Sequence, residues 1–510
     1  MARIFIGIDS GTQSTKALVV DGDTGKIRGS ASHSYGLISG LPHGAKEQHP
    51  DVWIDATKKS VRAAMRKAKA RPTDVLGVGV SGQQHGFVAL DDEGRVIRPA
   101  KLWCDTSTAS QCEHLIRKIG GLGHVIELTG NSIPPGFTAS KILWLKQVEP
   151  RNFARLATIL LPHDYINFWL TGERTMEHGD ASGTAMLDVK TRRWSEPVLA
   201  AIDSNLASFL PPLHSSDQPA GKVRPDAARQ LGIAPGALVS AGGGDNMMGA
   251  IGTGNTRPGI VTASFGTSGT IYGYSARPVI DSDGEIAAFC DSTGGWLPLL
   301  CTMNVTVATE LVKRLFSLDN DKLRALVKQS PPGAGGLLLV PYFDGERTPN
   351  VPNGTGMFFG LRDATFDKAH MARAAMEGVT LGMNYGLNRL CTLGLRPKEI
   401  RITGGGSNDA EWRQIMADVF ATPVVTMHTS EGAAYGAALQ AKWTWHLHRG
   451  ERVRISAITD KFVKVDNGSR VEPRRDAVKI YKELQHIQDS FKNCCRDEFA
   501  LHAKFRSAAA

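Results

Sequence analysis

The sequence predicts an α/β protein whose two domains repeat one structural plan. Segments with the pattern of buried strands alternate with segments of helical spacing along most of the 510 residues, and this alternation is typical of layered α/β folds. A glycine-containing hairpin near the N-terminus also returns half a chain later. A chain of this length has room for two domains with sizeable cores, and we expect them to span residues 1–246 and 247–510.

The first hairpin joins two apolar strands through a polar turn. Residues 4–8 read as a buried strand, Asp9–Lys16 as the turn, and Ala17–Asp21 as the returning strand. The related segment, residues 259–273, carries Gly266-Thr267-Ser268-Gly269 at its turn. Such turns present backbone N–H groups and hydroxyls that can hold a phosphate group. The pair therefore predicts two phosphate-binding turns, and two unrelated hairpins with glycine turns are the alternative.

Strands and helices alternate through the rest of the first half. Helical spacing over residues 54–69 precedes a buried strand at 75–81, the polar run Gly82–Gly86 and a further strand at 87–90. Residues 110–235 are mostly helical with loops, so we expect them to elaborate the first core.

The second half repeats this plan. A helix predicted over residues 368–394 leads to a strand at 399–403, which the glycine-rich turn Gly404–Asn408 follows. A helix with apolar residues at helical spacing comes next, and then a strand at 423–427 and a helix at 432–445.

Composition and charge narrow the class of protein. The net charge of +9 is spread along the chain without a basic stripe, interleaved aromatics or a recognisable module, so we expect no nucleic-acid partner. The seven cysteines are odd in number and have no zinc-site spacing. The apolar opening stops at Asp9, too early for a secretory signal, and no run reaches the length of a membrane span. We therefore expect a reduced, cytoplasmic protein without a membrane partner.

Asp9 stands where the first apolar strand meets the polar turn. Mg²⁺ binds one or two carboxylates together with water and phosphate oxygens. A carboxylate beside a phosphate-binding turn is therefore a candidate metal ligand, and an aspartate that only caps the turn is the alternative.

Asp245 follows the glycines 242–244 at the end of a predicted strand. Because glycine has no side chain, none of these three residues blocks access to the Asp245 carboxylate. That suits a base that accepts the proton of a hydroxyl as the hydroxyl attacks phosphorus. A loop-capping aspartate is the alternative.

Three further features are candidates for binding. Gly404–Asn408 lies at a strand–helix junction, where glycines let the backbone approach a ligand closely, although any tight turn also uses glycine. His85 follows Gln84 at a strand end, in a polar cluster suited to a polyol, and a histidine bonded to backbone is the alternative. Trp103 could pack against a sugar or belong to the core.

Together these segments resemble the FGGY family of carbohydrate kinases, within the sugar kinase/Hsp70/actin superfamily. The resemblance covers nearly the whole chain in order. The matching segments are Asp9–Lys16, Gly82–Gly86, Trp103–Asp105, Leu161–Trp194, Asp245-Asn246, Gly266–Gly269, Pro341–Pro349 and Gly404–Asn408. Gly82–Gly86 is the most substrate-specific of them, since glycerol kinases carry a different sequence there.

The resemblance implies two actin-like (ribonuclease H-like) domains with a deep cleft between them, binding ATP, Mg²⁺ and a sugar. Carried over by position, Asp245 would be the general base and Asp9 would sit near the metal. The sugar-binding residues would be Gln84, His85, Trp103, Asp245 and Asn246. The residues around the nucleotide would be Thr12, Ser14, Lys16, Gly266, Thr267, Gly405, Gly406 and Asn408.

One segment departs from the family pattern. Many bacterial members have Trp-Asn-Asp followed by a small residue and arginine, whereas this chain has Trp103-Cys104-Asp105-Thr106-Ser107. The resemblance therefore leaves open which side chain contacts the far end of the sugar.

The reaction that the resemblance implies is ATP-dependent phosphorylation of a ketopentose, with D-xylulose, at its O5, as the first choice. Another polyol, such as ribulose, an alditol or a deoxyketose, is the alternative substrate. A non-catalytic actin-like nucleotide switch is the alternative class, and Asp245 in its open glycine turn argues against it. Many relatives are dimeric, so a homodimer is a further expectation.

Overall fold

The computed structural model describes residues 2–509 and divides the chain into two compact units. The first unit holds the residues up to Arg257, together with Tyr274–Pro298 and Glu431–Val463. The second unit holds Pro258–Gly273, Leu299–Ser430 and the residues from Lys464 onward. Compactness does not say what each part binds, so the functional division after residue 246 stays a prediction.

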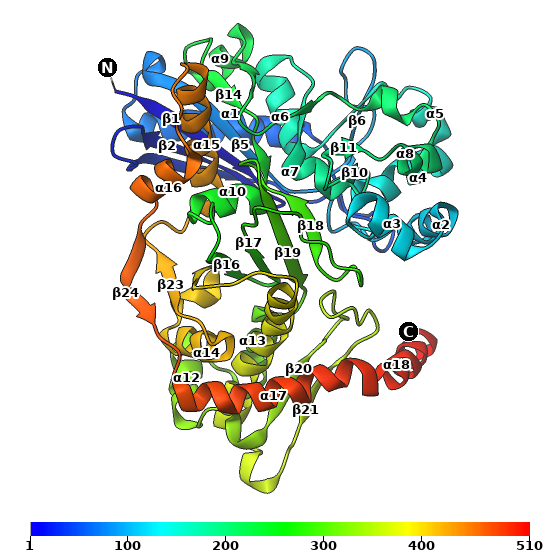
Figure 1. The fold of residues 1–510 in the computed structure, drawn as a ribbon, viewed down its shortest axis with the longest axis vertical. Helices are drawn as coiled ribbons and strands as arrows, with labels where there is room; N and C mark the ends of the chain where they lie inside the picture. The colour runs from blue at the N-terminus through cyan, green and yellow to red at the C-terminus, as the bar shows by residue number, and fades with distance from the viewer. Residues whose placement is uncertain (1, 510) are drawn as a thin grey trace. The chain divides into compact units, whose positions relative to one another are not determined.

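The first unit is built on one mixed sheet (Figure 1). Its strand order is β13-β14-β5-β1-β2-β3, and β15 pairs with the end of β5. β1 runs parallel to β5 and antiparallel to β2. The strands are β1 (Ile4–Ser10), β2 (Ser14–Asp21), β3 (Ile27–Ser34), β5 (Val75–Gly82), β13 (Pro219–Lys222), β14 (Leu238–Ser240) and β15 (Gly243–Gly244).

The two faces of β1 meet two different helices, because side chains alternate along a strand. Ile4, Ile6 and Ile8 join the core cluster that contains Trp53 of α1 (Asp51–Ala68). α15 (Gly432–His448), drawn in orange in Figure 1, contacts β1 and β5. It lies so close that a Cβ atom on Gly7 would come within 1.8 Å of the Ala434 carbonyl oxygen. Only glycine permits this approach.

α10 (Asp245–Gly252) packs on α15 in the same way. A Cβ atom on Gly252 would lie 1.8 Å from the carbonyl oxygen of Gly432, and one on Gly436 would lie 1.8 Å from that of Met248. The helix that begins at Asp245 is therefore held firmly against the layer that covers the sheet.

Helices and short strands extend the first unit, as the sequence predicts. The helices are α2 (Ala109–Ile119), α3 (Leu122–Thr129), α4 (Thr138–Val148), α5 (Pro150–Phe153), α6 (Pro162–Thr171), α7 (His178–Ala181), α8 (Glu196–Ile202), α9 (Pro225–Leu231) and α16 (Ile455–Phe462). The short strands are β4 (Glu47–Gln48), β6 (Val88–Leu90), β7 (Ala100–Lys101), β8 (Thr158–Leu160), β9 (Met176–Glu177), β10 (Leu187–Asp188), β11 (Arg193–Trp194), β12 (Leu213–His214) and β18 (Ala287–Cys290).

The second unit repeats the strand plan of the first. Its strands follow the order β19-β17-β16-β22-β23-β24, with β16 antiparallel to β17 and parallel to β22. The strands are β16 (Ile260–Phe265), β17 (Gly269–Gly273), β19 (Trp296–Thr302, of which the last four residues belong to this unit), β22 (Glu399–Thr403), β23 (Val424–Met427) and β24 (Val465–Val471). A separate hairpin pairs β20 (Leu338–Pro341) with β21 (Gly356–Phe359).

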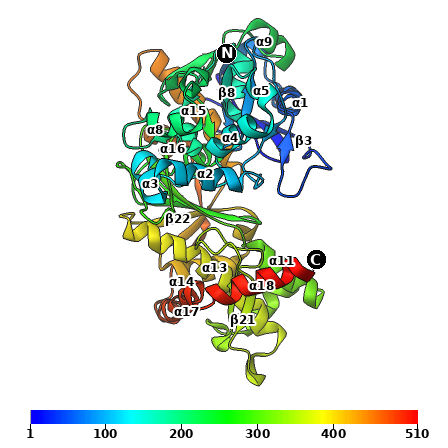
Figure 2. The same cartoon turned by 90° about the vertical axis from the view of Figure 1, so that its right-hand side faces the viewer.

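Helices cover this second sheet. α13 (Lys368–Thr392) and α14 (Ala410–Phe420) contact each other, and α17 (Arg475–Cys494) lies beside both (Figure 2). The remaining helices are α11 (Thr306–Phe316), α12 (Asn320–Gln329) and α18 (Arg496–Ala509).

The structure confirms the predicted alternation and the repeated plan, and it corrects two local interpretations. The first turn is shorter than predicted, because Ser14 and Lys16 already belong to β2 and Lys16 pairs with Asp9 across the ladder. Asp245 does not end a strand but opens α10.

Two wider expectations can be compared with the structure. None of the helices within residues 2–509 has the length and apolar character needed to cross a bilayer. All seven cysteines have free thiols.

Candidate active site

Asp9 and Asp245 are brought together by the carboxyl end of β5. Asp9 pairs with Ser81 on one side of this strand, and Gly244 pairs with Gly82 on its other side. Asp245 follows Gly244 directly. The Ser81 hydroxyl donates a 2.8 Å hydrogen bond to Asp9 Oδ1. Two carboxylates from distant parts of the chain thus flank one strand end.

Burial and mutual repulsion change how these carboxylates titrate. Burial, and then the negative charge of Asp9, raise the pKa of Asp245 to about 7, against the hydrogen bonds that it accepts from Asn246. Burial also raises the pKa of Asp9, although the Ser81 hydroxyl and the charge of Lys16 oppose that rise. A carboxylate with a pKa near neutrality can hold or release a proton at physiological pH.

Gln84 and Asn246 form the polar surroundings of Asp245. Asn246 Nδ2 donates to Gln84 Oε1 at 2.8 Å and to Asp245 Oδ1 at 3.0 Å. Gln84 Nε2 is buried and has no hydrogen-bond partner among residues 2–509. Buried polar groups are nearly always paired, so this amide points to a ligand that supplies an acceptor.

His85 is held in an unusual backbone conformation beside these residues. Its φ of 62° lies in the left-handed region, which side chains seldom adopt. Lys141 Nζ donates to the His85 carbonyl oxygen at 2.7 Å, and the imidazole lies 4.4 Å from the ring centre of Phe137 and 5.6 Å from that of Phe289. A Cβ atom on Gly183 would lie within 2.3 Å of the imidazole, so glycine makes room for it.

A hydrogen-bond chain ties Trp103 to the first turn. Trp103 Nε1 donates to Thr12 Oγ1 at 2.9 Å, and this hydroxyl donates to Gln83 Oε1 at 3.2 Å. Gln48 Oε1 accepts from Gln83 Nε2 at 3.1 Å and from Trp53 Nε1 at 2.9 Å. Thr12, expected at the nucleotide, and Trp103, expected at the sugar, therefore contact each other directly.

The segment that departs from the family pattern is held by Asp105. This buried carboxylate accepts hydrogen bonds from Lys101 Nζ at 3.0 Å, from the Ser107 hydroxyl at 2.6 Å and from the Lys46 backbone at 2.9 Å. Burial opposes its charge, but these donors outweigh burial and lower the pKa of Asp105. Its donors keep this carboxylate paired, so Asp105 anchors the Trp103 segment.

The remaining predicted residues of the first unit lie on β2. Lys16 Nζ forms a 2.5 Å ion pair with Glu431, the residue before α15. Ser14 stands at the start of β2, where its carbonyl oxygen accepts from the Gly11 amide and closes the turn.

Asp9 is a candidate ligand for a magnesium ion. No group of three histidine, cysteine or acidic side chains within residues 2–509 is arranged to hold a metal. Mg²⁺ is commonly held by one or two carboxylates, with water and substrate phosphate completing its shell. Asp9 lies near the end of β1, next to the first predicted phosphate-binding turn, and fits this donor set as one carboxylate ligand.

In the second unit, Gly266 and Thr267 form the turn between β16 and β17. The Gly266 amide donates to the Ser268 carbonyl oxygen, and the Gly266 carbonyl oxygen accepts from Thr306 at the start of α11. Thr267 is exposed and lines a cavity of about 640 Å³. The other lining residues include Thr306, Val307, Glu310 and Arg314 of α11.

Gly405, Gly406 and Asn408 form a 3₁₀ turn beside that hairpin. Gly404 precedes it with a φ of +83°, and a Cβ atom there would come within 2.6 Å of the Phe265 carbonyl oxygen at the end of β16. Gly405 and Asn408 are exposed. The structure thus brings the two predicted nucleotide turns of this unit together.

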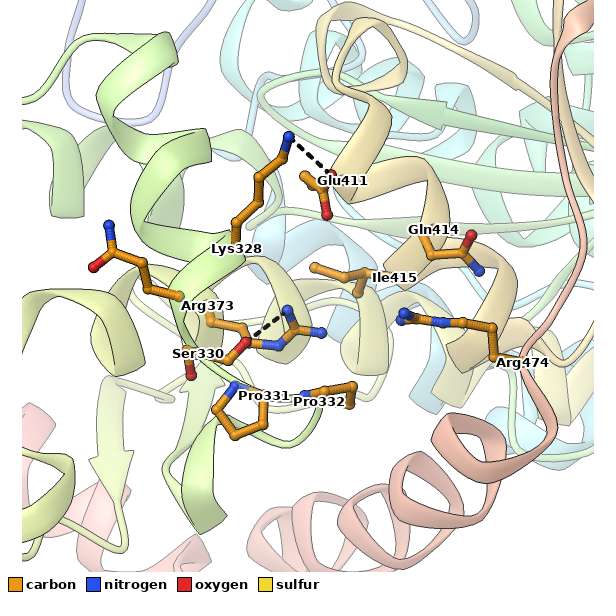
Figure 3. A pocket seen from close by; sticks show the side chains of 10 residues that line it. Lys328, Ser330, Pro331, Pro332, Arg373, Glu411, Gln414, Ile415 and Arg474 are labelled. Atoms are coloured by element: carbon orange, nitrogen blue, oxygen red, sulfur yellow. Dashed lines mark hydrogen bonds and ion pairs between the residues drawn. The ribbon is translucent and has the colours of Figure 1, made fainter.

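A second cavity, of about 370 Å³, lies elsewhere in this unit among α12, α13 and α14 (Figure 3). Its cationic side chains are already paired. Lys328 forms an ion pair with Glu411, Arg373 donates to the Ser330 carbonyl oxygen, and Arg474 binds Asp418.

Sequence reasoning missed several residues that shape the site. Ser81, Glu431, Phe137 and Phe289 have no local signal, because their roles depend on contacts across distant segments. His163 lies within a quoted motif, yet its complete burial could not be read from the sequence.

Comparison with known proteins finds one protein family along most of the chain. Residues 4–252 match the FGGY family of carbohydrate kinases, N-terminal domain, and residues 261–445 match its C-terminal domain. A xylulose kinase of Haemophilus influenzae is 42% identical over 485 residues, covering 94% of this chain and 97% of that protein. A xylulose kinase of Bacillus subtilis is 33% identical over 498 residues, covering 96% of each.

Solved structures agree as well. A xylulose kinase from Rhodospirillum rubrum superposes with a TM-score of 0.87 at 28% identity, covering 98% of this chain and all of that one. A glycerol kinase from Plasmodium falciparum, solved with ADP, has a TM-score of 0.85 at 19% identity, covering 96% of this chain and 98% of that one. This second likeness concerns the fold alone.

Proposed function

Because the chain belongs to the FGGY family of carbohydrate kinases, we propose that it transfers the γ-phosphoryl group of ATP to D-xylulose, at O5. The observation that carries this proposal is the hydrogen bond that Asp245 accepts from Asn246, whose amide also donates to Gln84, at the end of β5. It places a proton acceptor among groups suited to sugar hydroxyls. The xylulose kinases that are 33% and 42% identical over almost the whole chain support the choice of sugar.

Asp245 acts as the general base in this proposal. Its carboxylate accepts the proton of the attacking hydroxyl while the bond from that oxygen to phosphorus forms. The bond from phosphorus to the oxygen of the leaving ADP breaks as the other forms. A pKa near 7 suits this task, since a base works best when its pKa lies near the working pH.

The sugar is held by side chains of the first unit. Gln84 Nε2 has no acceptor within the described residues 2–509 and donates to a sugar oxygen, and Asn246 orients the Gln84 amide for this. His85, fixed by Lys141 and Phe137, presents its imidazole to the sugar. Trp103 packs against the carbon chain.

ATP is held by backbone groups and small side chains. We assign the phosphates to Thr12, Ser14, Lys16, Gly266 and Thr267, and the rest of the nucleotide to Gly405, Gly406 and Asn408. Asp9 would hold Mg²⁺, which would neutralise the negative charge of the phosphates.

A coupled ADP-release assay with ATP and Mg²⁺ against a panel of ketoses and alditols tests this proposal. We expect strong turnover with D-xylulose, with ³¹P NMR identifying the product as the 5-phosphate. Turnover with ribulose or an alditol instead would keep the kinase and reassign its substrate. ADP release that does not depend on any sugar would contradict the proposal and favour a nucleotide switch.

The cytoplasmic location and the homodimer also stay predictions. Light scattering of the purified protein tests the homodimer, which predicts twice the mass of the 54.9 kDa chain. Fractionation of the source cells tests the location.

A further inference from the structure

Three charged side chains of the first unit are buried together behind the candidate base. His163, Asp164 and Asp180 are 0%, 1% and 0% exposed. His163 Nδ1 lies 2.9 Å from Asp180 Oδ2, and His163 Nε2 lies 2.9 Å from Asp164 Oδ1. One imidazole thus faces two carboxylates, and the proposed reaction gives none of the three a role.

The charge state of this cluster follows from its partners. Burial disfavours a charged imidazole, but the carboxylates of Asp164 and Asp180 outweigh it and raise the pKa of His163 well above its ordinary value. Burial raises the pKa of Glu177 to about 7, and the positive charge of His163 opposes this rise. His163 is therefore an imidazolium that balances buried negative charge.

His163 packs against Gly82 of β5 through its main chain and against Gly242, three residues before Asp245, through its imidazole. A Cβ atom on Gly82 would lie 2.8 Å from the His163 amide nitrogen, and one on Gly242 would lie 3.0 Å from His163 Cδ2. Gly82 pairs with Gly244, the residue before Asp245. One turn further along α6, Asn167 Nδ2 donates to the Ala241 carbonyl oxygen at 2.8 Å. α6 therefore braces the segment that carries the base.

The charge of this cluster also affects the pKa of Asp245. Asp180 raises the pKa of Asp245, as does Asp9 from the other side of β5, while Asn246 lowers it. A cation 2.9 Å from Asp180 offsets part of the negative charge near the base.

We infer that His163 is a positioning residue for Asp245: its imidazolium packs against the Gly242 segment that leads to the base and, paired with Asp164 and Asp180, screens Asp180 from the base. This inference rests on the proposed function, because it concerns the same carboxylate. A buried ion cluster that serves the fold alone is the competing explanation, since such clusters contribute little net stability but are costly to break.

The pH dependence of kcat/KM for D-xylulose separates the two explanations. His163→Gln removes the cation and leaves Asp180 to repel the deprotonated base. We expect the acidic limb of the pH profile to move up by about half a pH unit, with activity at pH 7 about twofold lower. Asp180→Asn keeps the cation and removes the repelling charge, so its limb should move down. The double variant H163Q/D180N should return the limb toward that of the wild type.

The matched control is Glu377→Gln in the second unit. Glu377 belongs to another buried cluster, with Arg373 Nε at 2.6 Å and the Tyr481 hydroxyl at 2.6 Å. We expect this variant to lower the melting temperature and leave the acidic limb unmoved.

Two results would overturn the inference. An acidic limb that stays in place in both His163→Gln and Asp180→Asn would leave the cluster a purely structural role. A double variant that moves the limb further from the wild type than His163→Gln would contradict the charge balance. If the wild type itself shows no sugar-dependent turnover, the proposed function fails as well. Normal wild-type turnover with unmoved limbs refutes this inference alone.

Discussion

The two units share a strand plan but use the ends of equivalent strands differently. β5 and β22 occupy the same place, each beside the first strand of a hairpin. The end of β5 continues into the buried side chains of Gln83 and Gln84, whereas the end of β22 continues into the exposed glycines 404 and 405. The same strand plan therefore places side chains at the end of β5 in the first unit and glycine backbone at the end of β22 in the second.

This difference matches the chemistry of the two proposed ligands. Phosphate oxygens all act as hydrogen-bond acceptors. Backbone N–H groups can donate to them whatever the local sequence is. A sugar must be distinguished by its hydroxyls and must lose a proton at one of them. Those tasks need placed amides and a tuned carboxylate, which the first unit supplies through Gln84, Asn246 and Asp245.

The largest expected effect comes from removing the base. Asp245→Asn keeps the shape of the side chain but cannot accept the proton, so we expect kcat to fall about 10³-fold, within the range typical of general-base loss. The KM for ATP should change less than about threefold, because nucleotide binding is assigned chiefly to other residues. Steady-state kinetics measure both. A kcat within tenfold of the wild type would contradict the role of Asp245.

Removing Asp9 should have a smaller effect with a distinct signature. In Asp9→Asn we expect kcat to fall about 10²-fold and the Mg²⁺ concentration for half-maximal rate to rise, because the metal loses a carboxylate. An unchanged Mg²⁺ requirement would argue against the metal site.

Paired glycine substitutions probe the second unit. Gly404→Ala forces a side chain into a left-handed conformation and against the Phe265 carbonyl oxygen. We expect a lower melting temperature and a KM for ATP about tenfold higher. Gly405→Ala is the matched control, because a Cβ atom there meets nothing within 4 Å. It should keep its melting temperature. Equal melting temperatures for both variants would contradict this account of the turn.

The smallest effect concerns stability. The folded state raises the pKa of Asp245 from 3.8 to about 7. Above pH 4 the unfolded chain therefore releases a proton that the folded chain keeps, and stability falls as pH rises toward 7. Asp245→Asn removes this cost, so we expect a gain on the order of 4 kcal/mol at pH 8 and almost none at pH 4. Thermal unfolding at both pH values measures it, and an equal gain at each would refute the raised pKa.

Sequence reasoning predicted the repeated plan because hairpins, strands and helices have local signals. The strand predicted at residues 399–403 is β22 as observed, and the helix that follows it has its apolar residues on the buried side. The error at the first turn arose because strand pairing overrides composition there. Ser14 and Lys16 look like turn residues, yet pairing with β1 and β3 extends β2 through them.

The contacts around the site could not be predicted in the same way. Gln84 and Asn246 are far apart in sequence, so their hydrogen bond depends on β15 lying beside β5. The burial of His163 and its two carboxylates likewise results from packing among α6, α7 and the end of β5. Residue types alone do not reveal such packing.

The most direct test compares the wild type with Asp245→Asn in one ADP-release assay, with ATP and Mg²⁺ and with or without D-xylulose. The account predicts that wild-type release depends on the sugar and that the variant loses this dependent rate by about 10³-fold. Sugar-independent release by the wild type, or sugar-dependent release that survives in the variant, would contradict it.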